Sequence, residues 1–291
     1  MRKKKIALNE LLNLIPEEYL ENLSEQTGVD YQVKKLTGKL VFKLLLYGLS
    51  SQKELSWRIL ETIFSSYKFK NYAQIPPDSR ADHSSLATRI SNIKVDFFKS
   101  IHQSLNKEIS LRFDTPRIGG YKVVRFDSTL VSIAGTLLKK VTAMHHGVNN
   151  KYRKIGDSVD LKFTIGFDGL SPVIADVFGQ QSYMSEEIAL KEVIENHDFK
   201  PDDLAVFDRG LNKRDTFDEF TDKSLIFVTR MKTQRKTVKH QLVRNVTNIS
   251  VEKPLETDKL WIDKDQEVIL FGRKSKKSKH SYRLIQARNK E

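Results

Sequence analysis

The order of apolar segments between residues 117 and 229 most constrains what this chain can fold into. Period-two alternation marks strands and three- to four-residue spacing marks helices, giving the order strand, strand, strand, helix, strand, helix, strand. In order, these segments are GGYKVVRFDS (119–128), LKFTIGF (161–167), SPVIADVFG (171–179), SEEIALKEVIENH (185–197), LAVFD (204–208), NKRDTFDEFTD (212–222) and SLIFVTR (224–230). Phe167-Asp168-Gly169 between the second and third strands is a hairpin signal.

This order predicts an α/β fold with one mixed sheet. Three antiparallel strands come first, and two strand–helix–strand crossovers, right-handed by rule, then add two parallel strands. That is the ribonuclease-H-like arrangement.

The segments on either side differ from this core. Residues 1–116 have helical spacing and predict an α-helical N-terminal DNA-binding region, with Ser51 as the N-cap of a helix that has Glu54 at the capping-box position. Residues 117–232 form the predicted catalytic core. Residues 233–291 are β-rich, with a turn expected at 263–265, and we interpret them as an insertion that is incomplete.

Composition narrows the function classes. The chain has no cysteine, which excludes a disulfide framework and thiolate metal sites. No apolar run approaches the ~20 residues of a membrane span, so we expect a cytoplasmic protein without membrane contact. The net charge is +13, and residues 230–291 contain 17 basic and 7 acidic side chains. This excess of positive charge indicates a polyanionic partner such as nucleic acid.

Two aspartates stand at strand ends. The first predicted strand ends at Asp127 and the fourth at Asp208, and these strands are neighbours in the predicted sheet. Two carboxylates ~4 Å apart repel each other by roughly 4 kcal/mol near a protein surface, so a cation between them is expected. Hard oxygen ligands select Mg²⁺ or Mn²⁺. Either aspartate alone is better explained as a turn former, whereas the two together at these positions favour metal ligands.

Basic side chains near these positions are candidate DNA-binding residues. Arg209 follows one aspartate directly, and Gly210 then allows the backbone to leave the strand tightly. The candidates for phosphate contact are Lys139, Lys140, Arg153, Lys154, Arg209, Lys213, Arg230 and Lys232.

The motifs resemble a known family. RFDST (125–129) and FDRGL (207–211) are similar to the first and second acidic motifs of DDE transposases of the insertion sequence 4 family. The hairpin FDGLSPVIADVFGQQ (167–181) and the helical unit HSSLATRISNIKVDFFKSI (83–101) also resemble that family. The resemblance implies a transposable-element enzyme for cut-and-paste DNA transposition. Its substrates would be double-stranded transposon-end and target DNA, synapsed by a homodimer, with Asp127 and Asp208 as two of three Mg²⁺ ligands.

One part of the family pattern is missing. The third carboxylate belongs to a Tyr-x2-Arg-x3-Glu-x6-Lys signature, which no tyrosine of this chain begins; after Tyr282, the arginine slot holds Ile285. The available acids Glu252, Glu256 and Glu267 lie in strand- or loop-like contexts. We therefore expect this chain to be inactive alone. A non-catalytic product that occupies transposon ends or inhibits full-length transposase, and a stand-alone nuclease with an unrecognised third acid, remain alternatives.

Several other motifs have two interpretations. The helices at 83–105 either present Ser84, Ser85, Thr88 and Arg89 to a major groove or form a plain helical hairpin. His145-His146 is interpreted as an exposed loop pair rather than a metal site. GRKSKKSKH (272–280) is interpreted as a solvated turn whose lysines add salt-dependent DNA affinity.

Overall fold

The computed structural model describes residues 15–133, 159–231, 238–249 and 255–290. The chain divides into two compact units, Met1–Asp114 and Thr115–Glu291, and each is described by itself. The segments interpreted as core and insertion both belong to the second unit. No helix within the described ranges is long and apolar enough to cross a membrane.

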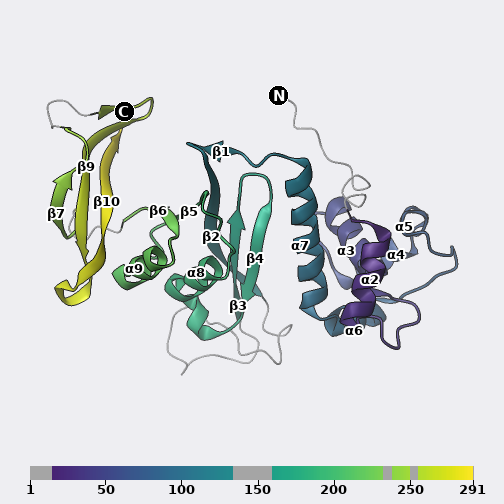
Figure 1. Cartoon of the computed structure of the whole chain (residues 1–291). Coiled ribbons are helices and arrows are strands. Elements are labelled where there is room, and N and C mark those ends of the chain that lie inside the picture. The colour runs from purple at the N-terminus through teal and green to yellow at the C-terminus, as the bar shows by residue number, and fades with distance from the viewer. Residues whose placement is uncertain (1–14, 134–158, 232–237, 250–254, 291) are drawn as a thin grey trace, which may run out of the picture. The chain divides into compact units, whose positions relative to one another are not determined.

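The first unit is helical, as the sequence predicts. Its helices are α2 (Glu17–Thr27), α3 (Gly38–Ser51), α4 (Trp57–Ser65), α5 (Tyr67–Ala73), α6 (His83–Asn92) and α7 (Val95–Arg112) (Figure 1). The expected N-cap at Ser51 is wrong. Ser51 is the last residue of α3, and the Ser56 side chain accepts the Ile59 N–H at the start of α4. Both serines suit a cap, so the sequence alone does not separate them.

Helix α6 begins with a cap that engages two serines proposed to read DNA. The Asp82 carboxylate accepts the hydroxyl protons of Ser84 (2.6 Å) and Ser85 (2.9 Å) and the Ser85 N–H. These hydrogen bonds hold the pKa of the Asp82 carboxyl below its ordinary value. The two hydroxyls are therefore committed to the helix N-terminus.

Arg89, the fourth groove candidate, is a structural residue. Its guanidinium donates to the carbonyls of Leu36 (2.7 Å) and Val29 (2.9 Å) and to the carboxylate of Asp30 (2.8 Å). Asp30 also accepts the Gly38 N–H at the start of α3. Arg89 thus ties α6 to the α2–α3 connection. The helices at 83–112 support the helical-hairpin interpretation, and the groove interpretation is wrong for Arg89.

The second unit contains a mixed sheet with strand order β4-β3-β2-β5-β6, and the short β1 pairs with β2. β3 is antiparallel to β2 and β4, whereas β5 is parallel to β2 and β6. The elements are β1 (Arg117–Ile118), β2 (Tyr121–Ile133), β3 (Val159–Phe167), β4 (Pro172–Phe178), α8 (Glu186–Glu195), β5 (Asp203–Phe207), α9 (Arg214–Asp222) and β6 (Ile226–Thr229) (Figure 1). The predicted order and types of these elements are confirmed.

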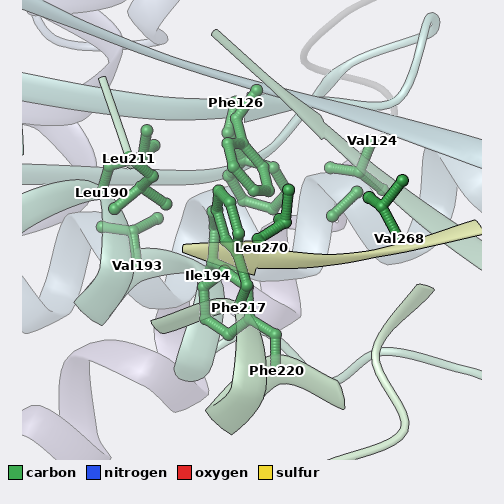
Figure 2. Close-up of a cluster of buried hydrophobic side chains, with 12 residues drawn as sticks. Val124, Phe126, Leu190, Val193, Ile194, Leu211, Phe217, Phe220, Val268 and Leu270 are labelled. Carbon is green, nitrogen blue, oxygen red and sulfur yellow. The ribbon is translucent and has the colours of Figure 1, made fainter. Parts of the chain in front are cut away.

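One face of this sheet is covered by α8 and α9. Val124 and Phe126 of β2 point to this face and pack with Val193 and Ile194 of α8 and with residues of α9 and β9 (Figure 2). The full set of buried residues in this cluster is Val124, Phe126, Leu190, Val193, Ile194, Ala205, Phe207, Leu211, Phe217, Phe220, Val268 and Leu270. Because side chains alternate along a strand, Arg125 and Asp127 of β2 belong to the opposite face.

The β-rich segment forms a second sheet with order β10-β9-β7, and β8 pairs with β9. Its strands are β7 (His240–Asn245), β8 (Leu255–Glu256), β9 (Leu260–Phe271) and β10 (Lys277–Asn289). The turn expected at 263–265 is wrong, since β9 continues through it. Asp265 is instead buried, and it accepts two hydrogen bonds from Arg283 (2.8 Å each) and one from Thr247.

The lysine-rich loop at 272–280 is not simply a solvated turn. α9 carries Asp215, Asp218 and Asp222 at spacings of three and four residues, hence on one face of the helix. Asp215 pairs with Lys276, and Asp222 pairs with Lys279 and His280. The backbone N–H groups of Lys279 and His280 donate to Asp218. Only the first part of this segment is a loop, since β10 begins at Lys277, and together the loop and the start of β10 join the second sheet to α9.

Candidate functional site

The two strand-associated aspartates lie on neighbouring parallel strands. Phe126 of β2 and Phe207 of β5 are paired in the parallel register, and Asp127 and Asp208 are the next residue of each strand path. β5 ends at Phe207, so Asp208 follows the strand directly. The expectation that β2 ends at Asp127 is wrong. β2 continues to Ile133 because β3 pairs with it over Thr129–Ile133. The pairing of β2 with β5 ends at Phe126, so Asp127 is the first residue of β2 beyond that pairing.

Both carboxylates belong to the face that α8 and α9 leave uncovered. Phe126 and Phe207 point into the core, and the next residue of an extended chain points the other way. Asp127 and Asp208 are accordingly both exposed. An Asp127 carboxylate oxygen accepts the Ser128 N–H (2.8 Å), and no Lys, Arg or His among the described residues pairs with either aspartate. Neighbouring strands of a sheet are ~4.8 Å apart, so the register places the backbones of these two aspartates close together, and among the described residues no cation pairs with either one.

The loop after Asp208 is held by the N-terminus of α8. Glu187 accepts the backbone N–H groups of Asn212 and Lys213. Lys213 is the N-cap residue of α9 and supplies no side-chain cap itself, so Glu187 caps this helix from another element. Leu211, which lies between Asp208 and Asn212 in the chain, is buried in the core at 1% exposure. The six-residue connection that contains Asp208, 208–213, is thus held by the burial of Leu211 and by the bonds to Glu187 at its α9 end.

Gly210 fits this loop for a packing reason. A Cβ at position 210 would collide with the carboxylate of Glu186 and would lie 3.2 Å from the Glu186 Cβ. The sequence predicts a glycine that frees the backbone, whereas the structure gives a close approach of α8. The roles of Glu186 and Glu187 were missed, because two acids in a first turn are equally explained by the dipole of their own helix. No local pattern marks a cap donated to a helix that begins 27 residues later.

The predicted DNA-binding residues are only partly described. Lys139, Lys140, Arg153, Lys154 and Lys232 lie outside the described residues, as does His145-His146. Arg209, Lys213 and Arg230 are all exposed. Arg209 follows Asp208, and Arg230 follows Thr229, whose Cα partner on β5 is Phe207. These two arginines therefore lie beside the carboxylate pair in the sheet.

A third metal-binding group does not join the pair within the described residues. No cluster of three or more His, Cys, Asp or Glu side chains there is arranged to hold a metal ion. Glu256 pairs with Lys290, and Glu267 accepts from Arg244 and Ser281. Glu252 lies outside the described residues. The chemistry of the two aspartates suits a hard cation, but the described donor set is incomplete.

Six Lys and Arg side chains of the β-rich segment form ion pairs within the described residues. Arg244, Arg283 and Arg288 on β7 and β10 pair with Glu267, Asp265 and Asp263 of β9. Lys290 lies over the Trp261 ring, 4.8 Å from its centroid. The excess of positive charge counted in this segment is thus partly used in ion pairs with β9 and α9.

Comparison of the chain with protein-family models found no match, and comparison with curated proteins found none either.

Proposed function

We propose that this chain is a DDE transposase of the insertion-sequence type, in which Asp127 and Asp208 bind Mg²⁺ or Mn²⁺ and act on transposon-end DNA. The strand order β4-β3-β2-β5-β6 supports it, since three antiparallel strands followed by two parallel ones with crossover helices is the ribonuclease-H-like arrangement. The short acidic motifs occur in that arrangement at the first and fourth strands.

One observation carries the proposal. The parallel pairing of Phe126 with Phe207 makes Asp127 and Asp208 neighbours on one open face. A fold gains nothing from two adjacent carboxylates unless a cation neutralises them. Divalent ions bound there would stabilise the attacking and leaving oxygens of a phosphoryl transfer. The exposed arginines 209 and 230 are suited to neutralising the phosphates of the same DNA.

The proposal extends to partners. The substrates are double-stranded transposon-end and target DNA, and synapsis of two ends calls for a homodimer. The helical unit is assigned to DNA binding through surfaces other than Arg89, Ser84 and Ser85, whose side chains are engaged internally.

A second candidate function follows from the donor set. Because the described residues supply no third acid, a non-catalytic DNA-binding protein that occupies transposon ends is the alternative. The two differ in metal binding, since only the first requires a divalent ion at the aspartate pair.

Mn²⁺ binding tests the proposal directly. Electron paramagnetic resonance titration should show a site in the wild-type chain that Asp127→Asn and Asp208→Asn each weaken at least tenfold. Asp198→Asn is the matched control, since Asp198 is exposed before β5, at the other end of the same strand. Equal Mn²⁺ binding by Asp208→Asn and the wild type would refute the metal assignment and leave the non-catalytic candidate.

A further inference from the structure

The arginines of the second unit fall into two groups. Five have a hydrogen-bonding side chain or ion pair: Arg117, Arg214, Arg244, Arg283 and Arg288. Among the remaining arginines whose side chains the structure describes, Arg125, Arg209 and Arg230 donate to no described residue. Five N–H donors left unused on one side chain are a large binding capacity for an oxyanion.

The three unpaired arginines surround the carboxylate pair. Arg125 lies two residues before Asp127 on β2 and pairs in register with Val206 of β5. Arg209 directly follows Asp208, and Arg230 directly follows the end of β6. The other arginines of this unit whose side chains the structure describes form ion pairs or hydrogen bonds, so Arg125, Arg209 and Arg230 are the ones left without a described partner.

Arg125 has a position that the sequence did not single out. By strand alternation it shares the open face with Asp127, opposite the buried Val124 and Phe126. Its Nη1 extends over the β3–β4 turn, where a Cβ at Gly169 would lie 3.8 Å from it. The nearby Asp168 offers no free charge, because it pairs with Lys122 (3.4 Å) and accepts the N–H groups of Leu170 and Ser171.

The spacing suits consecutive phosphates. Residues two apart on a strand are separated by roughly 7 Å, which is close to the separation of neighbouring phosphates along a nucleic-acid strand. From β2 across β5 to β6 is roughly 10 Å, or about three nucleotide steps at 3.4 Å of rise. The cross-strand neighbour of Arg125 is Phe167, a 41% exposed ring, which lowers the local dielectric and strengthens a charged contact.

We propose that Arg125 is a positioning residue that holds a DNA phosphate beside the aspartate pair, with the strand crossing the sheet from β2 towards Arg230. This inference rests on the proposed function, because it assumes that the aspartate edge receives DNA. Arg125 binds one phosphate through two N–H donors, and the next phosphate along the DNA strand then lies beside the carboxylates of Asp127 and Asp208.

Salt-dependent binding of duplex DNA, measured by fluorescence anisotropy with Mg²⁺ present, tests this assignment. In Arg125→Ala we expect affinity on the order of fivefold weaker and a slope of log affinity against log salt that is smaller by about 1. Arg125→Lys should restore the slope but only part of the affinity, because an ammonium lacks the paired donors. Lys200→Ala is the charge-matched control, since this exposed lysine precedes β5 at the opposite end from Asp208.

The outcomes separate the two proposals. Loss of slope in Arg125→Ala but not in Lys200→Ala, with unchanged thermal unfolding and Mn²⁺ binding, supports the assignment. Equal slopes in both variants, or no binding of duplex DNA by the wild type, overturn it. If Arg125→Ala behaves as wild type while Asp208→Asn loses Mn²⁺, the Arg125 inference fails and the metal site stands. If Asp208→Asn keeps Mn²⁺, the proposed function fails first.

Discussion

At the residue scale, the polar side chains of this protein differ most in whether they already form hydrogen bonds or ion pairs within the fold. Asp127 and Asp208 were singled out from the sequence because each follows a short apolar strand segment, although β2 continues past Asp127. The internal use of Arg89 was not, because its acceptors lie 53 to 60 residues away. The sequence thus predicts two candidate site residues but does not separate free cations from those that are paired internally.

Arg89→Ala should destabilise the helical unit. The substitution leaves the carbonyls of Leu36 and Val29 and the Asp30 carboxylate without their donors, and we expect a loss of about 2–3 kcal/mol in unfolding free energy. Urea unfolding followed by circular dichroism measures it. Arg58→Ala removes an exposed arginine from α4 and should cost less than about 0.5 kcal/mol. Similar losses in both variants would contradict the structural role of Arg89.

Glu187 links a cap to the position of Asp208. Glu187→Ala removes the acceptor of the Asn212 and Lys213 N–H groups and should cost about 1–2 kcal/mol of unfolding free energy. Glu187→Gln keeps an oxygen acceptor and should retain most of the stability. Mn²⁺ affinity should follow the same order, because a looser connection displaces Asp208. A Gln variant as damaged as the Ala variant would show that the charge, not the cap, matters.

At the element scale, strands and helices with strong periodicity were predicted well, and boundaries set by partners were not. β3 and α8 contain their own signals. β2 extends to Ile133 only because β3 pairs with its last residues. The Asp-Lys-Asp sequence at 263–265 predicts a turn, but β9 continues through it. Arg283 and Thr247 donate hydrogen bonds to the buried Asp265, which makes its burial in the strand possible. Such compensation comes from other strands and cannot be read locally.

The attachment of the second sheet to α9 should weaken in acid. Hydrogen bonds from Lys279 and His280 hold the pKa of the Asp222 carboxyl below its ordinary value, and those from Arg283 and Thr247 do the same for Asp265. A depressed folded-state pKa gives stability that is fully present above the unfolded value near ~3.9 and is lost as the pH falls through the folded value. Urea unfolding should therefore show a steeper loss of stability below about pH 4. It adds to a gradual loss that begins near ~6.5, because burial lowers the pKa of His197.

Two variants locate that acid sensitivity. Asp222→Asn and Asp265→Asn remove the titrating groups, so each should lower stability at neutral pH and flatten its decline in acid. For Asp265→Asn the loss at pH 7 should be about 1–2 kcal/mol, less than for a fully buried pair because Arg283 is largely exposed. A decline as steep as that of the wild type in both variants would assign the acid sensitivity to other carboxylates.

At the scale of the whole molecule, charge counting and charge placement give different pictures. The net charge of +13 indicates a polyanionic partner, and by count residues 230–291 carry most of the positive excess. Several of those cations form ion pairs with carboxylates of β9 and of the acidic face of α9. The unpaired arginines of the second unit lie instead beside Asp127 and Asp208. Only the three-dimensional pairing, which joins residues on different strands and helices, reveals this.

Releasing the paired cations should therefore create DNA affinity. In Asp215→Asn combined with Asp222→Asn, Lys276, Lys279 and His280 lose their acidic partners. We expect tighter binding of duplex DNA and a salt slope steeper by about 2, since each newly available phosphate contact adds about 0.9. Asp198→Asn combined with Asp258→Asn makes the same change in net charge at aspartates that pair with no described residue. If both double variants bind DNA equally, net charge alone governs the affinity; a steeper slope in the first alone means that α9 masks a basic loop.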